Sequence, residues 1–374
     1  MTHDQQVLRS MLHAAAEWDP LYPTTDLGLL TDHLPMALQA LWRLGATPAQ
    51  MLAFQTDYAK KLVPVTQREW VDVGPVDGSV DGSVDGSVDG SRDGWRQWLG
   101  DWRIYLPLRA RLIADIAAQG RVAVLRTWLP RFIECLAIDA LHPLIRVGYG
   151  VEQEIDEEIA AGLAYWAAAF RSGAPIVSAP IAGEAVDLFA KLRDTRELTG
   201  IKFSSASFAA RLQQIGNEPR FGEVSGWRNP NIDLQALARE AARIYLSTHN
   251  FFALHMVTGA HAIGMLVPYV DDQQLLLDRG WQALAATYLI IGTPRYSFVQ
   301  RDVVVPSFVL PSFVLPSLVL PSNAQLVEAT LLVKYDNEHA IKLAHSAREA
   351  FALWQMPEHA MILADLARGV PHTA

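Results

Sequence analysis

The residues of this sequence that could carry chemistry are histidines in apolar surroundings. The segment FFALHMVTGAHAIGML, residues 251–266, holds His255 and His261 among side chains that are almost all apolar. A buried imidazole whose nitrogens lack partners destabilises a fold by about 1–3 kcal/mol. Either each histidine finds a backbone or side-chain partner, or a metal ion takes the ring lone pairs.

Three further histidines have comparable surroundings. His33 lies in LLTDHLPMAL just ahead of a predicted helix, His142 in LAIDALHPLIRVGYG at the end of an apolar helix, and His339 in VKYDNEHAIKLAHSA. Each one alone suits a structural role, but five in one chain favour a shared metal site, because histidine is the commonest metal ligand. Four histidines near the chain ends have polar neighbours and are set aside: His3, His13, His359 and His372.

Helical geometry limits which of these residues can act together. Residues six apart on a straight helix point about 120° away from each other. His255 and His261 therefore share one ion only if Thr258-Gly259 allows a kink. Otherwise one is a ligand, and the other either supports a ligand from outside or faces the substrate, where it could serve as a base.

Lys342 stands three residues after His339, on the same helical face. It is either a surface lysine or, between Ile341 and Leu343, a buried one. A buried lysine loses its proton readily, and the neutral amine reacts with carbon dioxide to give a carbamate. A carbamate is an oxygen ligand for a metal ion.

The fold class predicted from periodicity is all-α, a single large multi-helix domain over residues 1–374. Apolar residues recur at helical spacing in eight segments, and sustained period-two alternation is almost absent. These segments are Leu34–Leu44, Leu106–Ala118, Leu125–Leu136, Glu154–Phe170, Ala185–Leu192, Leu234–Leu246, Trp281–Ile291 and His339–Trp354. Thr47 and Asp233 are predicted N-caps.

Two low-complexity repeats interrupt this pattern. Residues 76–91 repeat the unit VDGS, whose aspartates recur every fourth position and so miss the spacing of calcium-binding loops. We expect a flexible surface insertion. Residues 306–322 repeat the unit PSFVL, and its prolines forbid a helix or a central strand. We expect an extended loop.

Composition narrows the class of protein. The net charge is −9 and no Lys/Arg cluster is present, which argues against nucleic acid or an anionic membrane as partner. The only cysteine, Cys135, provides neither a disulfide nor a thiolate metal site. No signal peptide and no apolar run of membrane-spanning length is evident, so we expect a cytoplasmic protein. Nothing indicates the oligomeric state.

Five segments, taken together and in this order, resemble the questin oxidase-like family. They are LLTDHLPMALQALWRLGATPAQM, WRQWLGDWRIY, ALHPLIRVGYGVE, FFALHMVTGAHAIGML and DNEHAIKLAHSARE. They extend from about Tyr22 to Phe351, and each repeat falls between two of them. The match rests on their number and order, since each segment alone is a weak signal.

The resemblance implies an oxidoreductase, a monooxygenase or dioxygenase that acts on polycyclic aromatic ketones of the anthraquinone type. It further implies a mononuclear non-haem Fe(II) held by histidines and a carboxylated lysine, with O2 and a small aromatic molecule as substrates. The candidates are His33, His142, His255, His261, His339 and Lys342, one histidine more than four-histidine-plus-lysine ligation needs. Zinc is the alternative metal. NADPH is associated with the family, but no GxGxxG motif is present to bind it.

Two rival interpretations stay open from the sequence alone. One is a non-catalytic protein that binds haem or a small aromatic, with a single axial histidine. The other is a helical scaffold in which the histidines satisfy one another and the PSFVL segment is a docking surface. A metal analysis separates them.

Overall fold

A computed structural model describes residues 3–24, 28–67, 69–71, 98–171, 185–225, 227, 233–297, 320–333, 337–370 and 372. The VDGS repeat lies outside these residues, and only residues 320–322 of the PSFVL repeat lie within them. The predictions for both repeats therefore fall outside the part of the chain that is described, apart from Ser322, which caps the helix that follows it.

Seventeen α-helices and one two-stranded sheet form the regular structure of the described residues, which confirms the all-α prediction. The first third contains α1 (His3–Ala15), β1 (Leu21–Thr24), β2 (Gly28–Thr31), α2 (Leu34–Arg43), α3 (Pro48–Tyr58), α4 (Tyr105–Gln119) and α5 (Arg121–Phe132). The middle contains α6 (His142–Glu152), α7 (Asp156–Ala169), α8 (Ala185–Asp194), α9 (Arg196–Thr199), α10 (Phe208–Gly216) and α11 (Pro219–Ser225). The last third contains α12 (Leu234–Thr248), α13 (Phe251–Leu266), α14 (Gln273–Ile290), α15 (Asn323–Leu331), α16 (Asn337–Trp354) and α17 (Pro357–Ala367).

Short 3-10 turns connect several of these helices: η1 (Ala59–Lys61), η2 (Val65–Gln67), η4 (Trp102–Ile104), η5 (Ile133–Cys135), η6 (Ile138–Leu141) and η7 (Val267–Tyr269). The turns η5 and η6 matter most for the site, because they carry the chain from α5 to α6. The bounds of α2, α4, α7, α8, α12 and α16 agree with the predicted segments within about two residues at each end.

Local capping explains where individual helices begin. The Thr47 hydroxyl accepts a hydrogen bond from the Gln50 backbone N–H, and the Gln50 side chain accepts one from the Thr47 N–H, so α3 begins with a capping box. The Asp233 carboxylate accepts from Ala236 N at 2.7 Å and starts α12. Both caps were predicted. The prediction for α14 began too late, because its cap is Asp272 rather than a residue near Trp281.

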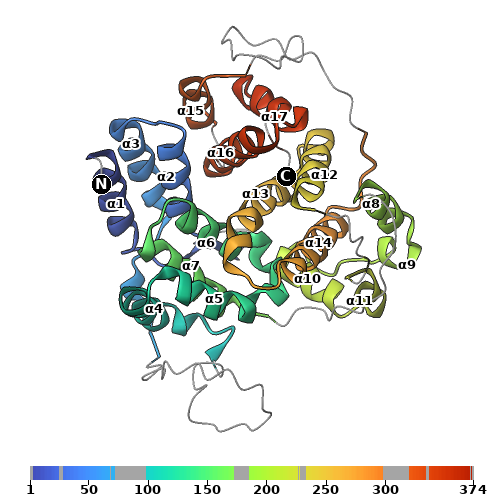
Figure 1. Ribbon diagram of the computed structural model, residues 1–374, viewed down its shortest axis with the longest axis horizontal. Coiled ribbons are helices and arrows are strands. Elements are labelled where there is room, and N and C mark those ends of the chain that lie inside the picture. Colours follow the sequence, from blue (N-terminus) through green and yellow to red (C-terminus); the bar gives the residue numbers. More distant parts are fainter. Residues whose placement is uncertain are drawn as a thin grey trace.

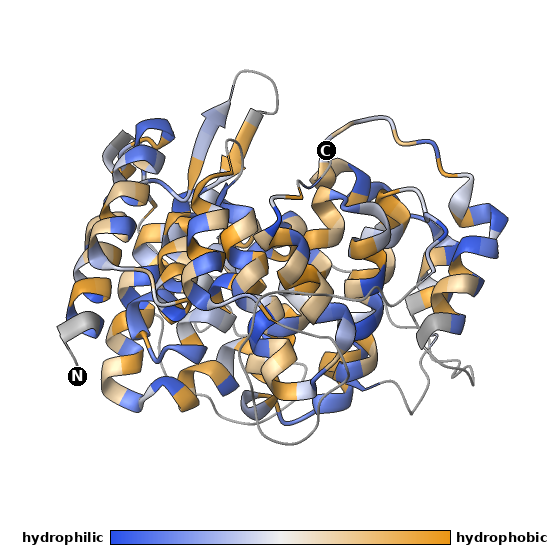
Figure 2. Cartoon of the chain, turned by 90° about the horizontal axis from the view of Figure 1, so that it is seen from above, coloured by the Kyte–Doolittle hydropathy of each residue, from blue (hydrophilic) through white to orange (hydrophobic). Residues whose placement is uncertain are grey.

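The antiparallel hairpin β1–β2 was not predicted. Each strand has four residues, with Leu21 opposite Thr31 and Thr24 opposite Gly28, which is too short for period-two alternation to be visible. Figure 2 shows the hairpin projecting from the helical body. Its second strand leads directly into Asp32 and His33, so it positions the start of α2.

The core centres on α6, α7 and α13, with the N-terminal helices on one side and α15–α17 on another (Figure 1). The helix α13 packs against both α6 and α16, while α2 packs against α16 and α6. Glycines allow the close approaches: a Cβ on Gly148 of α6 would lie 2.9 Å from Ala262 Cβ of α13. A Cβ on Gly162 of α7 would lie 2.7 Å from Val147 N of α6. These contacts hold α6 tightly between its neighbours.

The segment Phe251–Tyr269, which comprises α13 and η7, has the length and mean hydropathy (1.4) of a membrane span, so the prediction that no apolar run reaches that length is wrong. Within the fold, 67% of the apolar 18-residue stretch in this segment is buried. A helix that is apolar all round and covered by other helices is typical of a protein core.

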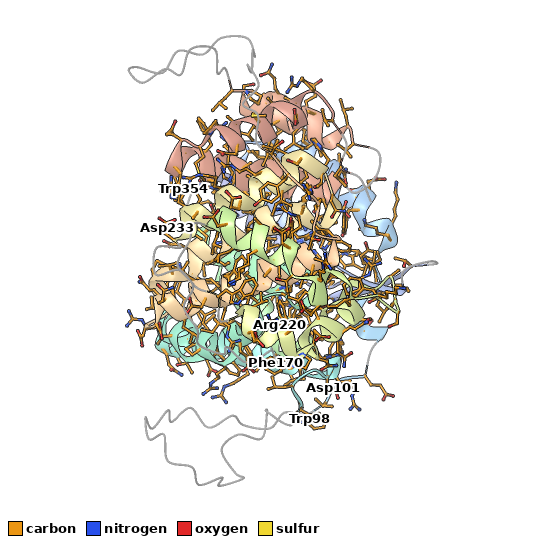
Figure 3. The ribbon with its side chains drawn as sticks, turned by 90° about the vertical axis from the view of Figure 1, so that its right-hand side faces the viewer. Trp98, Asp101, Phe170, Arg220, Asp233 and Trp354 are labelled. Carbon is orange, nitrogen blue, oxygen red and sulfur yellow. The ribbon has the colours of Figure 1, made fainter. Side chains whose placement is uncertain are left out.

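The end of α7 is tied to the turn that precedes η4. Gly100 N donates to Ala167 O at 2.9 Å, and Arg171 Nη1 donates to Gly100 O at 3.3 Å. In Figure 3, Trp98, Asp101 and Phe170 accordingly lie at the same end of the molecule. This junction places Trp102 beside a cavity of about 440 Å³.

Candidate metal centre

The chain reaches α6 through a left-handed turn. Asp139, Ala140 and Leu141 have φ angles of 45°, 54° and 66°, a conformation that costs about 1–3 kcal/mol for each non-glycine residue. The turn ends at Leu141, the N-cap of α6, and His142 is the first helical residue. The prediction that His142 ends a helix is wrong. The sequence carries no glycine signal for this reversal.

Four predicted histidines meet at the centre of the fold. His33 is the N-cap of α2, His142 begins α6, His255 lies in the second turn of α13, and His339 lies in the first turn of α16. All four are buried. The ring centroid of His33 lies 4.4 Å from that of His142 and 4.5 Å from that of His339. His255 is 4.7 Å from His142 and 5.0 Å from His339.

A hydrogen bond to the backbone identifies the tautomer of His255. His255 Nδ1 lies 2.9 Å from Phe251 O, and a carbonyl only accepts, so the ring proton is on Nδ1. His255 Nε2 therefore carries a lone pair. His142 Nε2 lies 3.0 Å from it and donates to it when it carries the ring proton of His142.

His33 and His339 share a carboxylate on their outer side. Their Nδ1 atoms lie 3.8 and 4.0 Å from Glu338 Oε1, which also accepts a hydrogen bond from Lys61 Nζ at 2.9 Å. None of the four ring nitrogens of His33 and His339 makes a hydrogen bond within the described part of the chain. With Nδ1 facing Glu338, Nε2 is the nitrogen available to the cluster. An outer carboxylate of this kind commonly orients metal-binding imidazoles.

Lys342 is fully buried one turn after His339 on α16. Burial first, and then the charge of Lys342, lower the pKa of His255 to about 3. Burial is also the largest cause that holds the pKa of His33, His142 and His339 well below the ordinary histidine value, with Lys342 and the neighbouring imidazoles adding to it. Neutral imidazoles are the form that binds metal ions.

The donor set fits a metal ion. One ligand nitrogen each from His33, His142 and His339 lies within 4.8 Å of the other two. Two imidazole nitrogens bound at about 2.1 Å to one ion at right angles lie about 3.0 Å apart, the distance observed between His142 Nε2 and His255 Nε2. The His255 Nε2 lone pair can accept a hydrogen bond from His142 Nε2 or, with the other tautomer of His142, share a cation with it.

His261, the remaining histidine candidate, belongs to a different cluster. Its Nε2 lies 3.6 Å from Glu152 Oε1, and His345 Nε2 lies 3.2 Å from Glu152 Oε2. Burial raises the pKa of Glu152, but the charge of His345 and the contacts with both imidazoles outweigh it and hold the pKa well below its usual value.

The helix α13 is continuous from Phe251 to Leu266, so the kink suggested at Thr258-Gly259 is absent from it. His255 and His261 face different neighbours, as their six-residue spacing on a straight helix requires. The structure thus brings His33, His142, His255, His339 and Lys342 together and leaves His261 apart.

Two of the histidines set aside are not in polar surroundings. His359 is buried in α17, and burial lowers its pKa to about 3. The ring of His372 lies 5.9 Å from Phe251 and 6.4 Å from His339, at the edge of the four-histidine cluster. Position near a chain end did not indicate exposure, because the C-terminal helices pack against α12 and α16.

Two residues with metal-binding side chains were not singled out in the sequence. They are Glu152 and His345. A signal for His345 was present, because it follows His339 by six residues, the same spacing that separates His255 and His261.

A cavity of about 440 Å³ lies next to the four-histidine cluster. Its lining includes Trp102, Asp139, Arg171, Phe221 and Arg279 but none of the four histidines. It approaches the cluster through Asp139, whose backbone is hydrogen-bonded to His142. A second cavity of about 380 Å³ reaches Glu152.

The chain belongs to the questin oxidase-like family, whose match extends over residues 30–347 and so covers most of the chain. All four clustered histidines and Lys342 lie within the matched range. Membership implies an oxidase and suggests an oxidoreductase that acts on aromatic polyketides. No match was found among curated proteins.

Proposed function

We propose that the chain is a non-haem iron oxygenase that inserts oxygen into, or cleaves, a ring of a polycyclic aromatic ketone. The observation that carries the proposal is the convergence of four buried imidazoles, in which Nδ1 of His255 faces a backbone carbonyl and Nδ1 of His33 and of His339 faces Glu338. One ligand nitrogen each from His33, His142 and His339 lies within 4.8 Å of the other two, and His255 Nε2 lies 3.0 Å from His142 Nε2. This convergence supports a metal centre more directly than a structural role, because structural histidines use both nitrogens in hydrogen bonds.

Iron is preferred to zinc because the family implies oxygen chemistry, although imidazole suits both metals. His33, His142, His255 and His339 would hold the ion, and Lys342 would provide an anionic oxygen if carboxylated. Bound iron would supply the activation of O2. Reduced nicotinamide stays a possible reductant, without a recognisable binding motif in the sequence.

The cavity beside Asp139 has a volume in the range that small aromatic ligands need. Trp102 and Phe221 offer ring faces for stacking a flat substrate, and Arg171 and Arg279 offer cationic donors for a ketone or phenolate oxygen. The Asp139 carboxylate, which lies 3.4 Å from the Tyr165 hydroxyl, is positioned to accept a hydrogen bond from a substrate hydroxyl. The Phe251 ring packs against the rings of His255 and His339, with centroid distances of 4.9 and 4.5 Å.

The four-imidazole arrangement disfavours the haem-binding alternative. A haem iron takes at most two axial protein ligands, whereas four imidazole rings gather here with neighbouring centroids 4.4–5.0 Å apart. Nor does it suit the scaffold alternative, since His33 and His339 do not satisfy each other by hydrogen bonds.

Oxygen consumption tests the proposal. Iron-loaded protein without a histidine tag should take up O2 when hydroxylated anthraquinones are added, and 18O2 should label the product. His255→Ala should lower the rate at least about 100-fold, because even outer partners of metal ligands cost 10–100-fold. His13→Ala, at an exposed position, is the control and should match the wild type. Full activity in His255→Ala, or no uptake with any polycyclic ketone by iron-loaded protein, would contradict it.

A further inference from the structure

The cluster of Glu152, His261 and His345 lies apart from the four-histidine centre, at the other end of α6. We propose that it is a second binding site for a divalent transition-metal ion. One ligand atom from each of the three residues lies within 4.8 Å of the other two. The three side chains come from α6, α13 and α16, so an ion there would join three helices of the core.

The polar atoms of this cluster are buried without adequate hydrogen bonds. His345 is fully buried, and neither of its ring nitrogens makes a hydrogen bond within the described residues. The same holds for His261 Nε2 and Glu152 Oε2. Both imidazoles are close enough to Glu152 for electrostatic attraction. The contact of 3.2 Å between His345 Nε2 and Glu152 Oε2 is misaligned for a hydrogen bond, and the contact of 3.6 Å between His261 Nε2 and Glu152 Oε1 is too long for one. Buried groups left in this state need another partner.

These contacts have the spacing of atoms that bind one ion. Ligand atoms at about 2.1 Å from a metal lie about 3.0–3.4 Å apart in octahedral or tetrahedral geometry. The observed distances of 3.2 and 3.6 Å from Glu152 to the two Nε2 atoms are close to this range. Aligned hydrogen bonds between imidazole and carboxylate would be shorter, about 2.7–2.9 Å.

Neighbouring residues hold the donors in place. The Tyr149 ring lies edge-on to His345 at 4.9 Å, and its hydroxyl is 3.0 Å from Ser346 Oγ and 3.2 Å from Lys342 O. The nearest cationic side chain is Arg43, 3.8 Å from Glu152 Oε1. Its closer partner is Glu349 at 3.1 Å, so its charge is largely neutralised.

The 380 Å³ cavity provides a route from solvent to the cluster, because Glu152 is part of its lining. The arginines around this cavity are paired: Arg9 with Glu157, and Arg121 with Glu154 and Asp156. A cation that enters therefore meets salt bridges, not unpaired positive charges.

The two clusters are related by helical spacing. His255 and His261 on α13, and His339 and His345 on α16, are each six residues apart, which corresponds to about 9 Å along a helix. One imidazole ligand cannot belong to both clusters at this separation. The second site is therefore distinct from the first.

The donor set defines the class of ion. Two imidazole nitrogens and one carboxylate are the ligands of open zinc sites and of mononuclear Fe(II) sites. No thiolate is near, and a site with two nitrogen donors is unsuited to calcium or magnesium.

Zinc stoichiometry tests the second site. Full-length protein freed of metal with a chelator is titrated with Zn2+ in competition with a chromophoric chelator, and bound zinc is measured by elemental analysis. The wild type should bind two equivalents. Glu152→Gln and His345→Gln should each lose one equivalent, with affinity at that site at least about 100-fold weaker. Glu328→Gln, which removes a carboxylate at an exposed position of α15 away from the cluster, is the control and should keep both.

One equivalent in the wild type, or two equivalents with unchanged affinity in Glu152→Gln, would overturn the proposal. Circular dichroism and thermal melting of the metal-free variants show whether they fold. Because Glu152→Gln and His345→Gln change different residues, the test still holds if one of these two variants misfolds. His339→Ala separates this inference from the proposed function. His339→Ala should lose the zinc of the four-histidine centre and keep the zinc of the second site. If His339→Ala loses zinc but Glu152→Gln and His345→Gln do not, the four-histidine centre stands and the second site does not.

Discussion

Replacing Gly148 by alanine tests whether the close contact of α6 and α13 positions the metal centre. Gly148 lies between His142 and Glu152 on α6 and faces Ala262 on α13. A Cβ there would lie 2.9 Å from Ala262 Cβ and 3.0 Å from its Cα. The backbone of Ala262 cannot rotate away as a long side chain would. The substitution must therefore move one helix relative to the other.

The size of the effect follows from these distances. Carbon atoms pack best at about 3.5–4.0 Å, so the helices must separate by about 0.6–1 Å. Overpacking of this kind costs about 1–3 kcal/mol, while alanine in a helix gains about 0.5–1 kcal/mol over glycine. The net expectation is a loss of about 1–2 kcal/mol in the free energy of unfolding. The separation between His142 Nε2 and His255 Nε2 should also grow beyond 3.0 Å and weaken metal binding.

Urea denaturation of metal-free protein measures the stability, and iron content after loading measures the centre. Gly216→Ala is the matched control, because Gly216 ends α10 and a Cβ there meets no atom within 4 Å. It should be neutral or stabilise by up to about 1 kcal/mol. If Gly148→Ala is as stable as Gly216→Ala and keeps full iron content, the account of α6 and α13 as a tight clamp is refuted.

Three other perturbations have definite expectations. Glu158→Gln should destabilise the fold by about 3–5 kcal/mol in urea denaturation, because the buried Arg146 guanidinium loses its carboxylate partner at 3.0 Å. A loss below about 1 kcal/mol would refute this expectation. Burial raises the pKa of the Cys135 thiol to about 12, so at pH 8 it holds about a thousandfold less thiolate than a free cysteine. Iodoacetamide should label it far more slowly in native than in urea-unfolded protein, and equal rates would contradict the burial. Lys342→Ala should lose iron affinity and regain part of it with acetate, whereas wild-type iron content without acetate would exclude a ligand role.

Periodicity was sufficient for the helical fold. The apolar spacing of α2, α12 and α16 is regular. Thr47 and Asp233 mark helix starts because their side-chain oxygens accept hydrogen bonds from backbone N–H groups of the first turn. The hairpin β1–β2 escaped notice because four-residue strands contain too few alternations to stand out.

The site was predictable only in part, for a geometric reason. A six-residue spacing shows that His255 and His261 diverge, but not which of them joins His33 and His142, because that depends on how α13 packs. The position of His142 was missed for another reason. Asp139, Ala140 and Leu141 adopt left-handed conformations without a glycine, and the packing around them, not local preference, imposes that turn.

Diffraction at the iron absorption edge tests the central claim most directly. Crystals of iron-loaded, tag-free protein should show an anomalous peak enclosed by the Nε2 atoms of His33, His142, His255 and His339, with density for an oxygen ligand extending from Lys342. Crystals with iron confirmed in solution but no peak among these four nitrogens would contradict the assignment of the metal centre.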